Sequence, residues 1–158
     1  MTDKTPTQSS STDKEHLRQE LLQLLHEQRS VALKAADSAH GDATHEQSVA
    51  ETQYDTVAIE AAYLAHGQSQ RVADFDAMIN QLNTLIVRDF TDTDEIALGA
   101  IVTLDNAMTC WLLPVCGGFK INNGKLIVIT PHSPLGQMIT GAEVEDTLAN
   151  GRTITGVC

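Results

Sequence analysis

The side chains with the most chemical potential lie close together, between His40 and Glu51. This stretch holds three carboxylates, Asp42, Glu46 and Glu51, and two imidazoles, His40 and His45. Carboxylate oxygens are the ligands that Mg²⁺ prefers, whereas imidazole combined with carboxylate suits a transition metal such as zinc. The stretch has neither a cysteine nor an HExxH pattern. We therefore interpret the histidines as polar loop residues and expect no metal site of the protein's own.

The three acids also have an ordinary structural interpretation. The segments Thr44–Gln47 and Ser48–Glu51 both fit the capping box, a pattern that starts a helix. In that case Glu46 or Glu51 caps a helix, and Asp42 is a loop residue. Both interpretations stay open at this point: carboxylates that present oxygens to a metal ion, and carboxylates that cap a helix.

Two long segments must position this stretch. Each carries apolar or small residues at alternating three-and-four spacing, which lines one face of a helix against a partner helix. Two such stripes joined by a polar break predict an antiparallel coiled-coil hairpin over residues 12–88. The first stripe consists of Leu17, Leu21, Leu24, Val31, Ala35 and Ser38, and the second of Tyr54, Val57, Ala61, Leu64, Val72, Phe75, Ile79, Leu82 and Ile86.

The ends of the two helices follow from capping signals. The segment Thr12–Glu15 fits a capping box and predicts the start of the first helix. Gly41 offers a stop for that helix, so we expect the tip of the hairpin at about residues 40–50. A tighter bend centred on Asp42 is the alternative. The paired part is then about 25 to 30 residues per arm, or about 40 Å.

After an acidic linker at 89–95, the pattern changes to that of strands. Apolar and β-branched runs occupy 96–104, 109–115, 125–130 and 153–157. Between them we expect turns at Asp105-Asn106 and at Asn122-Asn123-Gly124. Ser133 is an expected N-cap, with Pro134 at the first position of a short helix and Gly141 just past its end. Residues 96–158 are therefore predicted to form a small, mostly antiparallel sheet with one short helix, which makes the chain an α+β protein.

Composition limits the classes of function. The formal net charge is −11, which argues against direct binding to a nucleic-acid backbone and favours a protein partner. Residues 1–11 form a polar tail that we expect to be disordered. No apolar run is long enough to span a bilayer. Three cysteines without a CxxC pair fit a reducing cytoplasm; we expect Cys110 in the core and Cys116 exposed.

Several motifs resemble the Gre family of bacterial transcription elongation factors. In that family a Gly-Lys-Ile strand leads to a Ser-Pro dipeptide and a short helix, as in the stretch 124–136 with the sequence GKLIVITPHSPLG. Ile139-Thr140-Gly141 fills the place of the family's Leu-Ile-Gly, and Leu98–Leu104 is similar to its Gly-Ala-x-Val-Thr-Val strand. Ala39–Asp42 and Ala50–Asp55 resemble the family's hairpin tip, although the segment between them is longer.

The resemblance implies both a fold and a function. It implies an FKBP-like C-terminal domain, and a hairpin that enters the secondary channel of RNA polymerase while that domain rests on the channel rim. It places Asp42, with Glu46 or Glu51, among the tip acids that help to hold a Mg²⁺ of the polymerase active site. It places a rim-contacting loop at Thr130, His132, Ser133 and Pro134, where His132 replaces a common acid.

The expected protein is an accessory factor without a catalytic centre or cofactor of its own. Because the tip is longer than in the family, we expect it to compete for the channel and to stimulate transcript cleavage weakly or not at all. The alternative is a peptide-binding or chaperone-like FKBP-fold module that uses the hairpin for dimerisation. Trp111 and Phe119 offer little for an aromatic-lined pocket. The sequence does not predict the oligomeric state or whether transcription is activated or inhibited.

Overall fold

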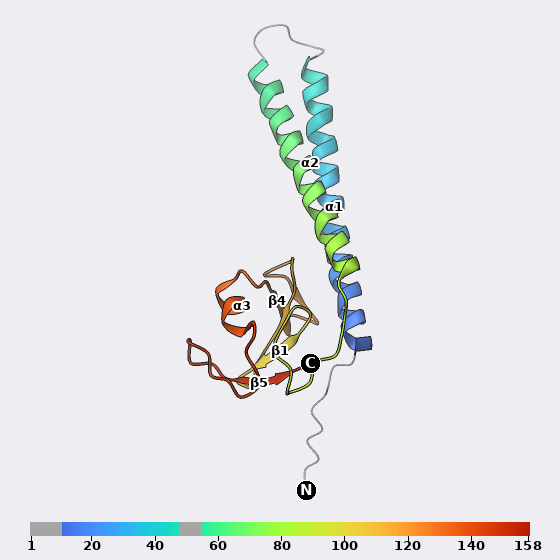
Figure 1. Cartoon of the computed structure of the whole chain (residues 1–158). Helices are drawn as coiled ribbons and strands as arrows, with labels where there is room; N and C mark the ends of the chain where they lie inside the picture. Colours follow the sequence, from blue (N-terminus) through green and yellow to red (C-terminus); the bar gives the residue numbers. More distant parts are fainter. Residues whose placement is uncertain (1–10, 48–54) are drawn as a thin grey trace. The chain divides into compact units, whose positions relative to one another are not determined.

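The structure is a computed structural model that describes the backbone of residues 11–47 and 55–158 and the side chains of 13–39 and 58–158. It has the predicted α+β composition, with two long helices followed by a small sheet (Figure 1). The chain divides into two compact units. One unit is the hairpin from Leu22 to Asn80. The other joins the first turns of helix α1, through Leu21, with everything from Gln81 onward. In the part of the chain that the structure describes, no helix could cross a membrane.

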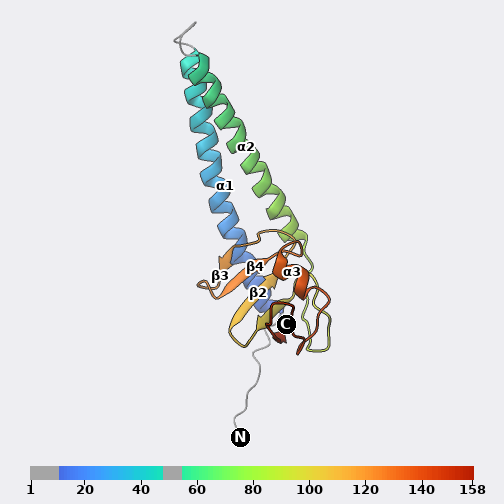
Figure 2. The same ribbon diagram turned by 90° about the vertical axis from the view of Figure 1, so that its left-hand side faces the viewer.

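Helices α1 (Ser11–Gln47) and α2 (Asp55–Thr84) run antiparallel and side by side (Figures 1 and 2). Their buried positions follow the three-and-four spacing of a coiled coil. An ion pair between Arg29 Nε and Asp76 Oδ1, at 2.6 Å, joins the two helices halfway along. Small residues fill the seam towards the tip, which allows the helices to approach closely. The buried seam residues of the hairpin unit are Leu22, Leu25, Ala32, Ala36, Ala39, Ala58, Ala65, Phe75 and Ile79.

The predicted stripe was correct for much of α2 but displaced in α1. Phe75, Ile79 and Leu82 are buried as predicted, whereas Leu64 and Ile86 are 57% and 82% exposed. Further predicted positions in α2, Ala61 and Val72, are half-buried, and those at 54 and 57 lie outside the described side chains. In α1, Leu21 is buried as predicted, but most of the seam lies one position later than predicted. Val31 is therefore 67% exposed and Ser38 faces solvent, while Leu17, Leu24 and Ala35 are half-buried.

Charged residues explain the displacement. Lys14 and Arg18 occupy inward positions of α1 and are buried. Arg29, further along the same face of the helix, is half-buried. Charged side chains on a helix normally face solvent. A prediction from apolar residues alone therefore leaves these positions out of the buried stripe and assigns the stripe to neighbouring positions. The actual seam uses their aliphatic stems and hydrogen-bonding heads.

Helix α1 also continues past the predicted stop. It includes Gly41 and ends at Gln47, so the expected tip at about 40–50 is wrong for its first half. An interior glycine costs a helix only about 1 kcal/mol relative to alanine, and the neighbouring Ala39 and Ala43 are strong helix formers. Gly67 is accommodated in α2 in the same way, and a Cβ added there would meet no neighbouring atom within 4 Å.

The sheet has five strands in the order β3-β4-β2-β1-β5. The strands are β1 (Ile101–Leu104), β2 (Met108–Leu112), β3 (Lys120–Ile121), β4 (Leu126–Ile129) and β5 (Ile154–Val157). Neighbours pair antiparallel except β2 and β4, which are parallel, with Thr109 opposite Leu126. The predicted turns at Asp105-Asn106 and Asn122-Asn123-Gly124 are present, and all five residues have positive φ angles.

Two features of the sheet were not predicted. Strand β3 was missed because two residues carry no alternating pattern, and the first strand begins at Ile101 rather than at residue 96. Residues 96–100 instead bend around Gly99, which has a φ of 93°. The core packs helix α3 (Pro134–Ile139) against the sheet and includes Phe90, from the predicted linker. Its buried members are Phe90, Ile96, Ala100, Val102, Leu104, Cys110, Leu112, Ile129, Ile139, Leu148, Ile154 and Val157.

Candidate functional site

The loop after strand β4 is built by a compact set of hydrogen bonds around Thr130 and Ser133. The Thr130 carbonyl accepts from the Ser133 hydroxyl at 2.7 Å and from the Ser133 backbone N–H at 3.0 Å. The Ser133 hydroxyl oxygen in turn accepts from the Gly136 N–H at 3.0 Å. Ser133 is therefore the N-cap of α3, as predicted, with Pro134 in the first turn.

Gly136 is required by a close backbone contact in the same loop. A Cβ atom at this position would lie 1.8 Å from the Thr130 carbonyl oxygen and 2.9 Å from the Ser133 hydroxyl oxygen. No side chain larger than hydrogen fits there without displacing the end of β4. The glycine thus lets the first turn of α3 lie directly against Thr130, just past the end of the strand.

The structure brings the four predicted rim-loop residues together in this loop. Thr130 and Ser133 are half-buried, and their polar groups serve the loop itself. His132 and Pro134 are exposed. The His132 carbonyl accepts a hydrogen bond from the Gln137 side chain at 3.1 Å, which holds the backbone of His132 in place. Internal capping accounts for Ser133, so the groups left for a partner are the side chains of His132 and Pro134.

The predicted tip acids cannot be placed as a site. Asp42 and Glu46 belong to helix α1, one turn apart in the chain, but their side chains, like those of His40 and His45, lie outside the described side chains. Glu51 lies outside the described residues altogether. Their proposed role near Mg²⁺ stays a prediction. Among the side chains that the structure does describe, no three of His, Cys, Asp and Glu are close enough to hold a metal ion.

A buried lysine ties the start of α1 to the C-terminal sheet region. The Lys14 ammonium donates to the carbonyl oxygens of Arg88 at 2.9 Å, Gly99 at 3.0 Å and Cys158 at 2.6 Å. It also lies 4.8 Å from the centre of the Phe90 ring. Lys14 is wholly inaccessible to solvent. Three segments far apart in sequence therefore converge on one side chain.

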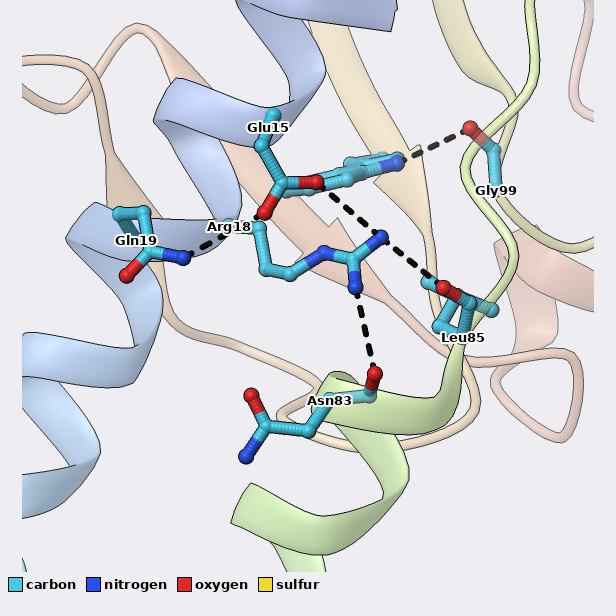
Figure 3. Close-up of polar contacts among 7 residues, drawn as sticks. Glu15, Arg18, Gln19, Asn83, Leu85 and Gly99 are labelled. Carbon is cyan, nitrogen blue, oxygen red and sulfur yellow. Dashed lines mark hydrogen bonds and ion pairs between the residues drawn. The ribbon is translucent and has the colours of Figure 1, made fainter.

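Arg18, one turn further along α1, caps the end of α2. Its guanidinium donates to the carbonyl oxygens of Leu85 at 2.9 Å and Asn83 at 3.4 Å, and pairs with Glu15 at 3.4 Å (Figure 3). The last carbonyls of a helix lack partners and carry negative partial charge. Because α2 has no basic residue in its own last turn, Arg18 supplies that charge from the neighbouring helix. Its Nε is buried and finds no partner among the residues that the structure describes.

Burial sets the ionisation of this region. Desolvation lowers the pKa of Lys14 from 10.5 to about 8, although nearby Cys158 and Asp89 favour its charged form. Burial raises the pKa of Cys110 and that of Cys116 to about 11, so both thiols stay protonated at neutral pH. Cys110 is a core residue as predicted. Cys116, expected to be exposed, is buried instead, and neither thiol has the lowered pKa of a nucleophile.

The aromatic residues near the sheet serve packing. Trp111 is fully buried, and its indole N–H donates to the Gly99 carbonyl at 3.0 Å. Phe90 lies in the core, with the Arg88 guanidinium 3.9 Å from its ring centre. The Gly99 carbonyl accepts from both Trp111 and Lys14, so this residue joins the sheet to helix α1. Neither aromatic ring offers a face to a ligand.

Sequence reasoning missed Lys14 and Arg18 as organising residues. A signal was present, because these two residues continue the spacing of Leu21 and Leu25 towards the helix start. A charged residue at a seam position of a coiled coil fixes register and partner. Their acceptors are backbone carbonyls of residues 83, 85, 88, 99 and 158, and no side-chain pattern reveals them.

Comparison with known proteins gives matches among solved structures. No protein-family model matches the chain, and no curated protein does. A structure described as the transcription factor Gfh1 has 15% identity and a TM-score of 0.37, covering 84% of this chain and 88% of that one. Gfh1 of Thermus thermophilus, a GreA factor homologue, has 17% identity and a TM-score of 0.33, covering 92% and 94%. Gfh1 of Thermus aquaticus has 20% identity and a TM-score of 0.33, covering 85% and 92%. The neighbours are thus homologues of a Gre factor.

Proposed function

We propose that the protein is a Gre-like regulator of transcription that binds RNA polymerase through protein–protein contact. The hairpin would enter the secondary channel, and the C-terminal domain would rest on the channel rim. The observation that carries the proposal is the stretch Gly124–Gly136, where the motif resemblance is most specific. It forms strand β4 and a loop that is held by the hydrogen bonds of Ser133 and by the close backbone contact at Gly136. A loop held in this way presents His132 and Pro134 at little entropic cost, as a contact surface requires.

The two long helices support the proposal further. They contain 37 and 30 residues, and at about 1.5 Å per residue even the shorter one is about 45 Å long. A polar hairpin of this length does not serve to form the hydrophobic core of the protein, and its shape suits a deep, narrow channel. The net charge of −11 favours basic protein surfaces over a phosphate backbone.

We propose weak or absent stimulation of transcript cleavage. Asp42 and Glu46 belong to a helix that continues to Gln47, whereas the family's two acids share a compact turn. Glu51 is nine residues beyond Asp42. A carboxylate about 1 Å from productive geometry can lose roughly a hundredfold in rate. Any Mg²⁺ involved would be that of the polymerase, and this protein would contribute no cofactor or catalytic centre of its own.

The alternative, a peptide-binding FKBP-fold module, gains no support from the observed geometry. Such a module needs an aromatic-lined pocket, but Trp111 is fully buried, Phe90 lies in the core, and the half-buried Phe119 lines neither cavity of the C-terminal unit described here.

The test uses core RNA polymerase and a stalled, backtracked elongation complex with Mg²⁺. We expect the full chain to co-purify with core polymerase and to leave the backtracked transcript largely uncleaved. The cleavage assay compares wild type with Asp42→Ala, Glu46→Ala and Glu51→Ala, and all four should show the same low activity. Robust cleavage that disappears in Asp42→Ala and in one glutamate variant would overturn the cleavage part. Failure to bind core polymerase would overturn the whole proposal.

A further inference from the structure

A shallow groove lies at the start of strand β4, at the opposite end of that strand from the loop described above. Its volume is about 500 Å³. Two lysines, Lys120 and Lys125, line it together with Met108, Thr109 and Ile127, and small residues of the two adjoining turns complete the lining. The groove therefore combines two ammonium groups with an apolar floor.

The charge of this groove is unusual for the chain. No carboxylate lines it, although the chain has 21 acidic residues and only 10 basic ones. Most other described cations are engaged: Lys14 and Arg18 in carbonyl hydrogen bonds, and Arg29 and Arg152 in ion pairs with aspartates. Lys120 and Lys125 are exposed and, within the described residues, make no ion pair, although Lys125 also lines an adjoining cavity that holds Asp13 and Glu20. Their charge is available to a partner.

The fold fixes the two lysines in position. Lys120 stands opposite Ile127 in the antiparallel pairing of β3 and β4, and Lys125 is two residues before Ile127. Lys120 and Ile127 therefore lie on one face of the sheet, and Lys125, the last residue of the turn, lines the same groove. The turn between the lysines has positive φ angles from Asn122 to Gly124. The Asn122 N–H donates to the Glu20 carboxylate at 2.9 Å, which anchors this turn to helix α1.

We infer that this groove is a docking surface for an acidic protein segment. An apolar side chain of the segment would lie on Met108 and Ile127, and carboxylates on either side would meet Lys120 and Lys125. A nucleic acid is the weaker fit, because two charges on a chain of net charge −11 neutralise few phosphates. The inference goes beyond the proposed function, since neither the tip nor the loop Thr130–Gly136 takes part. The surface is a second, separate contact.

The direct test is an NMR titration of the full, ¹⁵N-labelled chain with a synthetic peptide of Glu-Glu-Leu repeats. We expect saturable shifts of the amides of Met108, Lys120, Gly124, Lys125 and Ile127, with those of residues 130–136 unmoved. The shifts should weaken strongly between about 0.1 M and about 0.5 M salt, because screening acts on exposed pairs. Shifts confined to other residues, or none up to millimolar peptide, would overturn the inference. So would a single-stranded oligonucleotide that moves the same amides while the peptide does not.

Matched variants separate a local site from general electrostatics. Lys120→Gln/Lys125→Gln should weaken peptide binding by about fivefold, the effect of losing two exposed ion pairs. Lys34→Gln/Arg71→Gln removes the same charge from exposed positions of the hairpin and should leave binding unchanged. The same spectra verify that each variant is folded. Equal weakening by both double variants would contradict a defined groove. Because the probe is a peptide, this result does not depend on whether the chain binds polymerase.

Discussion

Replacing Gly136 with alanine should strongly destabilise the C-terminal unit. The new Cβ would lie 1.8 Å from the Thr130 carbonyl oxygen, whereas real Cβ atoms essentially never come closer than 3.0 Å. The carbonyl must therefore retreat by more than about 1 Å, which breaks its two hydrogen bonds from Ser133. Two such bonds are worth about 1 to 3 kcal/mol together, and overpacking adds about 1 to 3 kcal/mol. We expect a loss of about 2 to 6 kcal/mol.

Urea unfolding followed by fluorescence measures this loss. Trp111 is the single tryptophan of the chain and is buried in the same unit as Gly136. Gly67→Ala makes the same chemical change in the interior of α2, where a new Cβ meets nothing within 4 Å. This control should stabilise the hairpin by up to about 1 kcal/mol, measured by circular dichroism. If Gly136→Ala stays within about 1 kcal/mol of wild type, the close contact that we describe is wrong.

Three further predictions concern the helices and Lys14. Lys14→Met leaves buried carbonyls without their donor and should cost about 1 to 3 kcal/mol at pH 7. Because burial lowers the pKa of Lys14 from 10.5 to about 8, the unfolded wild type binds more protons than the folded form between those values. The free energy of unfolding of wild type should thus rise relative to that of Lys14→Met as the pH rises from 8 to 10.5. If urea unfolding gives a difference between the two that does not change with pH, this prediction is wrong. Ile79→Asp buries a carboxylate in the seam and should unfold the hairpin, at a cost of several kcal/mol; Leu64→Asp, at an exposed site, should leave helix content unchanged, and equal loss in both would refute the assigned seam. Circular dichroism of wild type should show well over one third helix, since α1 and α2 alone contain 37 and 30 of 158 residues.

Local chemistry made parts of this fold predictable. The turn at Asn122–Gly124 and the cap at Ser133 depend on residues within a few positions of one another, and both were correct. The hairpin was predictable from repeated apolar spacing, which summed over many turns outweighs any single residue. From the sequence, helix α1 is expected to end at Gly41, but the helix continues, because the cost of one glycine is small compared with the helix propensity of its neighbours.

Long-range contacts account for what the sequence did not reveal. Lys14 and Arg18 are inward-facing because carbonyl oxygens of distant segments accept hydrogen bonds from them, and backbone acceptors have no side-chain signature. The parallel pairing of β2 with β4 depends on how β3 turns back beside β4. Gly136 was predictable as part of a motif, but its contact with the Thr130 carbonyl exists only in three dimensions. The tip acids remain a prediction from motif resemblance.

Competition for core RNA polymerase tests the central claim most directly. The full chain carries a fluorescent label and is titrated with core polymerase, and an unlabelled Gre factor is then added as competitor. The proposed function predicts saturable binding that the Gre factor displaces, because both hairpins would occupy the same secondary channel. Absence of binding, or binding that an excess of the Gre factor leaves unchanged, would contradict it.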